Sequence, residues 1–380
     1  MKAIKVRIYP KRNPREVIAK TVGCCRFIYN WALEKRIAFY QSEKKSIHKY
    51  ELINGIADLK KENEWLREVP SQALQQSVFD LDSAFSHFFK KNNAFPKFKS
   101  KKNARQSYRM PQGFEINRDS HYIKLPKLGW VRFIDEFHVP ENAVFKNVTV
   151  SRECDQYYAA VCYDVPKKQS KQFNVKESKT LGIDLGIKTL ATLSDGTKID
   201  NPKHLKKYEA KIIAEQRCLA KKEVGKKSYD KQKLKLAKAH RKVRNTRLDF
   251  LHKLTTSLVD NQNWTSFCIE DLAVRDMQQN RFLAKSIGDV GWRMFRSMME
   301  YKCEDRGKNL IVIGRFEPSS KTCTCGVVNA DLSLSDRTWT CSTCNVTHDR
   351  DILAANNIKT FGLRAGQSPL AVKGHRTPRL

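Results

Sequence analysis

Hydrophobic and polar residues change their spacing several times along the chain, and each change marks a predicted element. Residues 2–9 alternate apolar and charged side chains up to Pro10, and this period of two predicts a strand. Over residues 14–91 the apolar positions instead recur every three or four residues, which predicts a layer of helices. The last of these helices is expected over residues 71–91.

Short alternating runs return between residues 108 and 165, separated by turn-forming residues, and predict a small antiparallel β-domain. We expect the first strand to join this sheet, so that the helical layer is an insertion. Between the two lies a basic segment with aromatic residues, NNAFPKFKSKKNARQSYR, which suits contact with a sugar–phosphate backbone but could also be a solvated linker. The candidate backbone contacts are Lys97, Lys99, Lys101, Lys102 and Arg105.

A polar, basic linker follows, and a new domain begins near residue 180. Residues 202–253 hold 18 Lys and Arg against 5 Asp and Glu, with few apolar positions. This pattern favours a helical hairpin with one basic face and a turn near Gly225. After Phe361 the chain has no periodicity, so residues 363–380 are predicted to be a disordered basic tail.

The charge identifies the class of partner. The chain has 380 residues, 40% of them hydrophobic, which is enough for two or three folded domains, and its formal net charge is +32. Nucleic acid is the leading partner for so basic a protein. An anionic membrane is the alternative, but the chain has neither an apolar run near 18 residues nor a strongly amphipathic basic helix. The charged N-terminus does not resemble a secretory signal, so we expect a cytoplasmic protein.

Three acidic residues lie in structured contexts far apart in the sequence. Asp184 lies on the first strand of a predicted hairpin, TLGIDLGIKTLATLSDGTKID. Glu270 ends an apolar strand, WTSFCIEDL, where open α/β sheets place catalytic groups. Asp351 begins a predicted helix and, taken alone, would be a helix cap or first-turn acid.

Together the three acids suggest a chemistry. Two-metal phosphodiester hydrolysis needs carboxylates that hold two Mg²⁺ ions about 3.5 to 4 Å apart. An RNase H-like core supplies them from its first strand, a central strand and a late helix, in the order of Asp184, Glu270 and Asp351. Strand transfer by a transposase would use the same metals, and the acids alone do not separate the two reactions.

Four of the eleven cysteines form a metal-binding pattern. The pairs Cys323-x-Cys325 and Cys341-x-x-Cys344 have the span of a structural Cys₄ zinc ribbon, inserted directly before Asp351. The ribbon is expected to fix how the chain enters the helix. His348 is a possible substitute ligand, and the shortened first pair requires an unusual knuckle.

Several motifs in combination strongly resemble one family. They are GCCRFIYNWAL, VPSQALQQSVFDLDSAFSHFF, FPKFKSK, GIDLGIKTLATLSDG, CIEDLAVRDM, GRFEPSSKTCTCG and TCSTCNVTHDRDILAANNI. They resemble the TnpB proteins of small bacterial and archaeal insertion sequences, which are relatives of the type V CRISPR effectors. The match covers nearly the whole chain; the departure is Cys323-x-Cys325, where the family usually has Cys-x-x-Cys.

The resemblance implies a multidomain α+β fold. It consists of an N-terminal β-barrel (wedge) domain with an inserted helical recognition block, then an RNase H-like (RuvC) α/β nuclease domain that carries a Cys₄ zinc-ribbon insert. On this chain the wedge would be residues 1–12 and 106–172, the recognition block 13–105, the nuclease 178–316 and 349–362, and the ribbon 317–348, before the tail.

The resemblance also implies a function. It is RNA-guided cleavage of double-stranded DNA, in a bacterial or archaeal cytoplasm and associated with the nucleoid. Since one chain would contain every part, we expect a monomeric ribonucleoprotein. The guide would be a noncoding RNA made from the transposon end. Asp184, Glu270 and Asp351 would be the nuclease triad holding two Mg²⁺, with Asp349 the alternative to the last of them.

Such an enzyme also reads a short DNA motif beside its target. Glutamine can pair with adenine through two hydrogen bonds, so our candidates are Gln72, Gln75 and Gln76 on the helix predicted over residues 71–91. These glutamines could equally face solvent or RNA. A regulator that binds its target without cutting is the competing function. A non-acidic residue in the triad would favour it, but all three positions are acidic in this chain.

Overall fold

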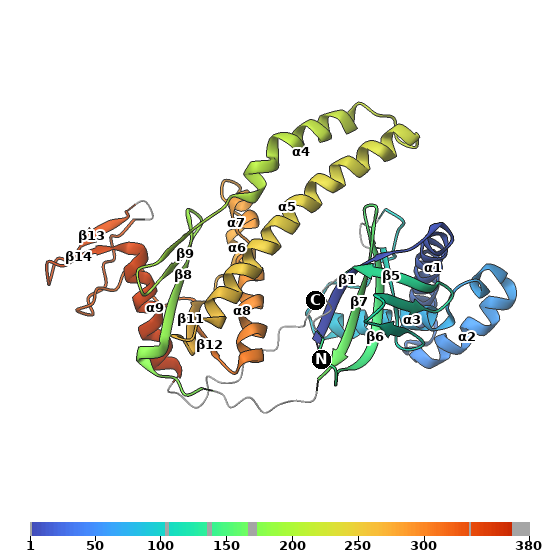
Figure 1. Cartoon of the computed structure of the whole chain (residues 1–380), viewed down its shortest axis with the longest axis horizontal. Coiled ribbons are helices and arrows are strands. Elements are labelled where there is room, and N and C mark those ends of the chain that lie inside the picture. The colour runs from blue at the N-terminus through green and yellow to red at the C-terminus, as the bar shows by residue number, and fades with distance from the viewer. Residues whose placement is uncertain (1, 103–105, 135–138, 166–172, 334–335, 367–380) are drawn as a thin grey trace. The chain divides into compact units, whose positions relative to one another are not determined.

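The computed structural model describes residues 2–102, 106–134, 139–165, 173–333 and 336–366. The chain forms two compact units, Met1–Lys167 and Lys168–Leu380, which are described separately (Figure 1). Both combine helices with a β-sheet. The division of the chain into the five finer segments given above stays a prediction.

The first unit is built on a seven-stranded antiparallel sheet. Its order is β2-β6-β7-β1-β5-β4-β3, so the N-terminal strand lies in the middle, between β7 and β5, as predicted. The paired strands end at β2 and β3, and closure into a barrel stays a prediction. The strands are β1 (Lys2–Tyr9), β2 (Gln106–Met110), β3 (Glu115–Asn117), β4 (Tyr122–Leu125), β5 (Gly129–Ile134), β6 (Val144–Glu153) and β7 (Gln156–Asp164).

The end of the basic segment NNAFPKFKSKKNARQSYR is a strand. β2 begins at Gln106, two residues before the expected start of the β-domain, because Tyr108 and Met110 alternate into the core beneath the polar residues between them. The helices inserted between β1 and β2 pack their apolar faces on the same core as the sheet. They are α1 (Arg12–Glu43), α2 (Lys49–Glu62), the short η1 (Glu64–Arg67) and α3 (Ser71–Phe89).

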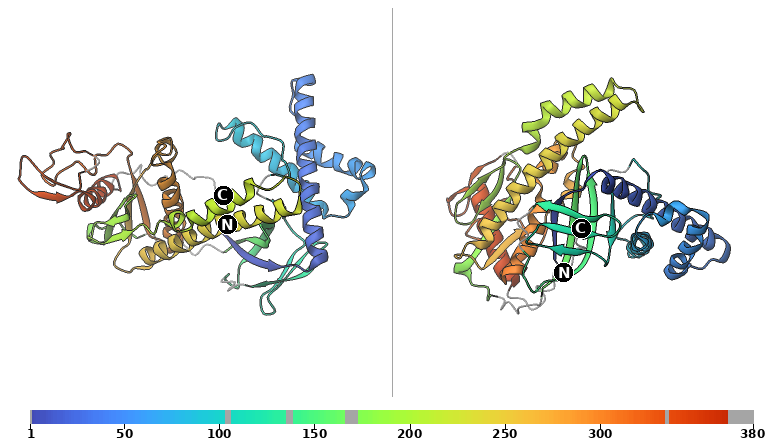
Figure 2. Two further views of the ribbon diagram at one scale, coloured as in Figure 1. Left: turned by 90° about the horizontal axis from the view of Figure 1, so that it is seen from above. Right: turned by 45° about the vertical axis from the view of Figure 1, so that its right-hand side comes forward.

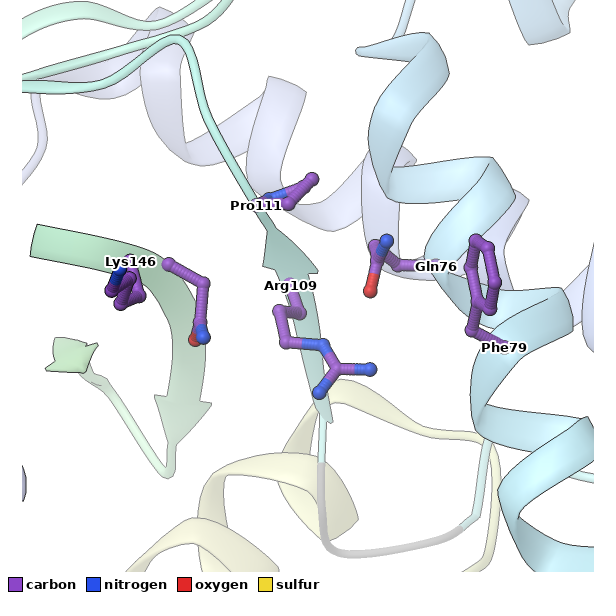
Figure 3. A pocket seen from close by; sticks show the side chains of 6 residues that line it. Gln76, Phe79, Arg109, Pro111 and Lys146 are labelled. Atoms are coloured by element: carbon purple, nitrogen blue, oxygen red, sulfur yellow. The ribbon is translucent and has the colours of Figure 1, made fainter. Parts of the chain in front are cut away.

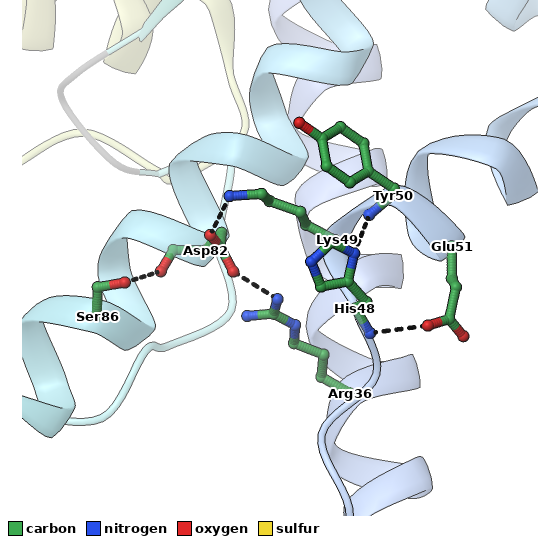
Figure 4. Close-up of polar contacts among 7 residues, drawn as sticks. All are labelled: Arg36, His48, Lys49, Tyr50, Glu51, Asp82 and Ser86. Atoms are coloured by element: carbon green, nitrogen blue, oxygen red, sulfur yellow. Dashed lines mark hydrogen bonds and ion pairs between the residues drawn. The ribbon is translucent and has the colours of Figure 1, made fainter.

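An ion-pair network joins the three long helices (Figure 4). Asp82 on α3 accepts hydrogen bonds from Arg36 of α1 at 2.6 Å and from Lys49 of α2 at 3.2 Å. Because the Arg36 side chain is only 9% exposed, the network fixes α1 against α3 more firmly than a surface pair would. His48 caps α2 and Glu51 completes the capping box.

The second unit is built on a five-stranded mixed sheet with the order β10-β9-β8-β11-β12. β8, β11 and β12 are parallel to one another, whereas β9 and β10 form the predicted antiparallel hairpins from β8. The strands are β8 (Thr180–Leu185), β9 (Thr189–Leu193), β10 (Lys198–Asp200), β11 (Ser266–Glu270) and β12 (Asn309–Ile313), and the short η2 (Glu177–Lys179) precedes them.

Helices cover both faces of this sheet, as the two views in Figure 2 show. On one face, β8 and β11 pack against α5 (Lys227–Asp260), α7 (Ala284–Val290) and α8 (Trp292–Arg306). On the other face lies α9 (Arg350–Gly366), whose Ile358 packs with Cys268 and Ile313. The short α6 (Val274–Met277) follows β11.

The basic segment forms the predicted helical hairpin. α4 (His204–Ala220) packs along the N-terminal half of α5 through Ile212, Ala239 and Val243, and Gly225 takes a left-handed φ of 96° between the helices. Figure 1 shows the hairpin extending well beyond the sheet of its own unit. Most of its surface is therefore available to a partner.

Helix α9 continues to Gly366, so the prediction that residues 363–380 are disordered is wrong for residues 363–366. The periodicity is lost after Phe361 although the helix goes on, because Gly362 lets the helix touch the sheet: a Cβ at this position would lie 2.3 Å from the Cys268 sulfur. The predicted tail beyond residue 366 lies outside the described residues.

Candidate nuclease and zinc sites

Asp184 and Glu270 lie on neighbouring parallel strands and point to the same face. In β8, Leu181, Ile183 and Leu185 enter the core beneath α5 and α8, so alternation turns Asp184 toward α9. In β11, Glu270 follows Cys268 on the α9 side in the same way. The register pairs Ile269 with Ile183, which places the two carboxyl groups side by side at the ends of their strands.

The close approach of α9 to β8 brings in the third acid. A Cβ at Gly182 would lie 2.0 Å from the backbone oxygen of Ala355, so only glycine allows this contact. Gly182 is two residues before Asp184 on the same strand face, and Asp351 is one helical turn before Ala355. Asp351 therefore lies on the same side of the sheet as Asp184.

The two acids of the sequence HDRD have different surroundings. Asp349 accepts hydrogen bonds from the backbone N–H groups of Asp351 and Ile352, at 3.1 Å each, and so caps α9. Its other oxygen pairs with Lys198 at 2.7 Å. Although burial acts in the opposite direction, these donors hold the pKa of Asp349 below its usual value. Asp351 has a looser partner, Arg337 at 3.6 Å, and remains available to face Asp184.

The three acids influence one another electrostatically. Burial raises the pKa of Asp184 to about 7, and the charges of Glu270 and Asp351 add to the rise, while Arg350 opposes it. Burial also raises the pKa of Glu270. A carboxyl group whose pKa is raised by burial and by neighbouring acids is stabilised by a cation, and carboxylate oxygen is the ligand that Mg²⁺ prefers. The residues therefore fit a divalent metal.

Several supporting residues were not predicted from the sequence. The Ser319 hydroxyl donates a short hydrogen bond to Glu270, and this bond limits the rise in the Glu270 pKa. Asn357 of α9 donates from one amide nitrogen to the backbone oxygens of Ser319 and Thr322, at 2.7 Å each, which ties that loop to the helix. No local pattern identifies these roles; the only sequence signal was the family-like segment GRFEPSSKTCTCG.

The structure brings the four predicted zinc ligands together. The sulfurs of Cys323, Cys325, Cys341 and Cys344 lie within 4.8 Å of one another, and neighbouring pairs are 3.5 Å and 3.7 Å apart. Tetrahedral zinc with Zn–S bonds of about 2.3 Å separates its sulfurs by about 3.8 Å, so the cluster fits this metal. In the described part of the chain, the three carboxylates do not form so tight a group.

The cysteine cluster lies directly before α9 in the chain. It includes a two-stranded ribbon, β13 (Thr338–Thr340) and β14 (Thr347–Asp349), in which Trp339 pairs with His348. The side chain of His348 is buried and its Nε2 lies 3.1 Å from the Cys323 sulfur. The four sulfurs could complete a tetrahedral set without His348, and its role as a substitute ligand stays a prediction.

The basic residues predicted to contact a nucleic-acid backbone differ in their surroundings. Lys97, Lys101 and Lys102 are exposed. Lys99 is partly buried: its ammonium lies 3.7 Å from the centroid of the Tyr29 ring, and its backbone exchanges hydrogen bonds with Asn30. Arg105 lies outside the described residues.

One of the predicted glutamines lines a pocket (Figure 3). Gln76 is partly exposed beside a pocket of about 270 Å³ in the first unit, whereas Gln72 lies one turn earlier and Gln75 points to solvent. Arg109 in this pocket pairs with Asp80 at 2.7 Å. The pocket is lined by Gln76, Phe79, Arg109, Pro111, Lys146 and Asn147.

Three family models match parts of the chain. Residues 160–281 match a model described as "Probable transposase" (OrfB_IS605), and residues 292–358 match the TNB domain of Cas12f1-like proteins. Residues 1–45 match a "Helix-turn-helix domain", although here they form β1 and the single long helix α1.

Comparison with curated proteins identifies the family. The chain is 38% identical over 376 residues to a Streptomyces pristinaespiralis protein named "Putative RNA-guided DNA endonuclease", covering 96% of this chain and 90% of that protein. The chain belongs to the TnpB family. A second member, InsQ of Escherichia coli K12, carries the same description and is 32% identical over 98% of this chain and 94% of its own length.

A solved structure supports the fold of this TnpB protein. The Cas12f1 chain in a cryo-EM structure of a Cas12f1–sgRNA–target DNA complex aligns with a TM-score of 0.55 at 14% identity, over 94% of this chain and 98% of that one. At this identity the likeness concerns the fold alone. None of the helices in the described residues is both long and apolar enough to cross a membrane.

Proposed function

We propose that this TnpB protein is an RNA-guided endonuclease that cuts double-stranded DNA in a RuvC-like site. The observation that carries the proposal is that Asp184, Glu270 and Asp351 come from β8, β11 and α9 to the same side of one sheet. The names of the curated relatives support it, and so does the place of the three acids on the first strand, a central strand and the last helix of the second unit.

In this proposal the three carboxylates hold two Mg²⁺ ions. When bound, the ions activate water and stabilise the leaving oxygen of the cut phosphodiester. Ser319 orients Glu270, and Asp349 fixes the first turn of α9 so that Asp351 points to the site. The four cysteines hold a structural zinc that sets the path of the chain into α9.

The partners follow from charge and family. A guide RNA from the transposon end and the target DNA are the polyanions that a chain of +32 would bind, with the α4–α5 hairpin and Lys97, Lys101 and Lys102 as backbone contacts. We expect a monomeric ribonucleoprotein in a bacterial or archaeal cytoplasm.

Three substitutions test the site, and two of them form a matched pair. In Mg²⁺, with guide RNA co-expressed from the native locus, the protein should cut a guide-matched plasmid that carries a randomised flank, and Asp184→Ala should abolish cutting. Asp351→Asn should also abolish cutting, whereas Asp349→Asn should retain most activity because asparagine caps a helix as well as aspartate and the lost Lys198 pair is solvent-exposed. If Asp349→Asn abolished cutting and Asp351→Asn retained it, Asp349 would be the metal ligand and Asp351 would not.

The plasmid products distinguish the competing functions. Bound but intact plasmid at every metal tested would favour a regulator. Joined strands in place of free ends would favour the strand transfer suggested by the description "Probable transposase".

The flanking motif has its own test. Gln76 lies in the pocket with Arg109 and Asn147, side chains that can hydrogen-bond to base edges. Gln76→Ala should relax the enriched flank at one position or more, whereas Gln75→Ala, on the same helix but exposed outside the pocket, should not. Gln72→Ala tests whether the turn before Gln76 takes part. An unchanged flank in both Gln76→Ala and Gln72→Ala would exclude this face of α3.

A further inference from the structure

The two cysteine pairs form knuckles that are alike except at one position. Each knuckle folds back through a left-handed residue directly after its second cysteine, Gly326 at φ 90° and Asn345 at φ 56°. A valine closes each turn, because Val327 accepts from the Cys323 N–H and Val346 accepts from the Cys341 N–H, at 2.8 Å and 2.9 Å. The first knuckle therefore lacks one residue between its cysteines and is otherwise equivalent.

The second cysteines have the same donors in both knuckles. The sulfur of Cys325 receives the backbone N–H of Val327, and that of Cys344 receives the N–H of Val346. Backbone N–H groups that point at a thiolate stabilise its negative charge, as any hydrogen bond to a charged form does. The missing residue thus leaves this half of the site unchanged.

The first cysteines differ. The sulfur of Cys341 faces two backbone N–H groups, those of Thr343 and Cys344. The sulfur of Cys323 faces one backbone N–H, that of Cys325. In both knuckles the residue after the second cysteine donates to the backbone oxygen of the first, Gly326 at 2.9 Å and Asn345 at 3.0 Å. Between the first cysteine and that residue, the shortened knuckle has two backbone N–H groups where the other has three. The shortened knuckle therefore gives its first thiolate one backbone donor fewer.

His348 lies against the sulfur that has fewer backbone donors. Its Nε2 lies 3.1 Å from the Cys323 sulfur, and both side chains are buried. The imidazole is held there by β14, where its ring lies 5.1 Å from the Trp339 ring on the paired strand. A ring nitrogen at this distance is placed to donate to the sulfur.

We propose that His348 is a positioning residue for zinc: its Nε2–H donates to the Cys323 thiolate and replaces the backbone donor that the shortened knuckle lacks. The inference rests on the proposed zinc site. It explains how a Cys-x-Cys pair holds the metal where the family usually has Cys-x-x-Cys. Since Asp349 follows His348 directly and caps α9, the same contact joins the zinc ribbon to the start of the helix that carries Asp351.

The test compares zinc affinity among variants of the full-length protein, by competition with a chromogenic chelator. His348→Phe keeps the ring against Trp339 but removes the donor, and we expect it to weaken zinc binding about 10- to 100-fold, as loss of a partner to a metal ligand does. His348→Gln, which keeps an N–H at similar reach, should lose less than His348→Phe.

A restored knuckle provides the sharpest control. One glycine inserted after Thr324 recreates Cys-x-x-Cys and its second backbone donor, so in that background His348→Phe should change zinc affinity by less than about 3-fold. This loss of effect is specific to the proposed role, because any effect of His348→Phe on packing would be the same in both backgrounds.

Three results would overturn the inference. Equal zinc affinity of wild type and His348→Phe would show that the contact is not needed. A ligand-field spectrum of the Co²⁺-substituted wild type with three sulfurs and one nitrogen would make His348 a ligand itself. Wild-type protein that binds no zinc would overturn both the zinc site and this inference. The first two results, in which the wild type binds metal, would overturn this inference alone.

Discussion

Replacing Asp184 by asparagine should stabilise the protein when magnesium is absent, although it removes a proposed metal ligand. Burial and the neighbouring acids raise the Asp184 pKa from 3.8 to about 7 in the folded protein. A carboxyl group with a raised pKa binds its proton more tightly in the folded than in the unfolded state. The wild type therefore loses stability as the pH rises from about 4 to about 7.

The size of the expected gain in stability follows from the shift in the Asp184 pKa. A difference of about 3 pKa units corresponds to about 4 kcal/mol at 1.36 kcal/mol per unit. Because the Asp184 side chain is partly exposed to water, we take about half of this, 2 kcal/mol, as the expected cost of ionising it. Asparagine cannot ionise, so Asp184→Asn should gain about 2 kcal/mol at pH 8, which corresponds to roughly 4–8 °C in melting temperature.

The assay is thermal unfolding of zinc-loaded protein at pH 5.5 and pH 8, with and without Mg²⁺. The gain should be larger at pH 8 than at pH 5.5 and should shrink when Mg²⁺ binds the wild type. Asp195→Asn, an exposed aspartate in the turn between β9 and β10, is the matched control and should change stability by less than about 0.5 kcal/mol. A gain at Asp184 that is absent, or independent of both pH and Mg²⁺, would refute the electrostatic reasoning.

The remaining predictions concern the supports of the site. Ser319→Ala should raise the pKa of Glu270 further, because it removes the hydrogen bond that opposes the rise, and should therefore shift the acid limb of the cleavage pH profile upward; an unmoved profile would mean that Ser319 does not act through Glu270. Gly182→Ala should destabilise the second unit by about 1–3 kcal/mol in denaturant unfolding, since its Cβ meets the Ala355 backbone, whereas Gly288→Ala in α7, with its nearest atom at 3.6 Å, should not; equal effects would disprove the close contact. Removing zinc with a chelator should lower the melting temperature of the second unit and reduce cleavage, and added zinc should restore both; a melting curve indifferent to zinc would contradict a structural role.

Local patterns along the chain determined most of the elements. Alternation identified β1 and β8, and helical periodicity with a long run of lysines identified the α4–α5 hairpin and its turn at Gly225. Where the pattern was misread, packing explains why. The loss of periodicity after Phe361 predicted the end of a helix, yet Gly362 is the residue that lets α9 approach β11. β2 was hidden in a basic run because only its alternate residues are buried.

The cysteine spacing and the three acids were also visible in the sequence, because ligand type, spacing and position on an element are local properties. The sequence left Asp349 and Asp351 as alternatives. Only the folded chain gives them different surroundings, since Lys198, the partner of Asp349, comes from β10, about 150 residues away. The support of Glu270 by Ser319, and of the Ser319 loop by Asn357, likewise joins segments with no sequence relation.

The sequence by itself therefore determined which elements form, which residues can ligate metal and to which family the chain is similar. The tertiary structure decided which face each acid points to, how closely α9 lies on β8, and that His348 reaches Cys323. The physical reason is that periodicity and ligand spacing act over a few residues, whereas burial, charge coupling and hydrogen-bond partners depend on which distant segments pack together.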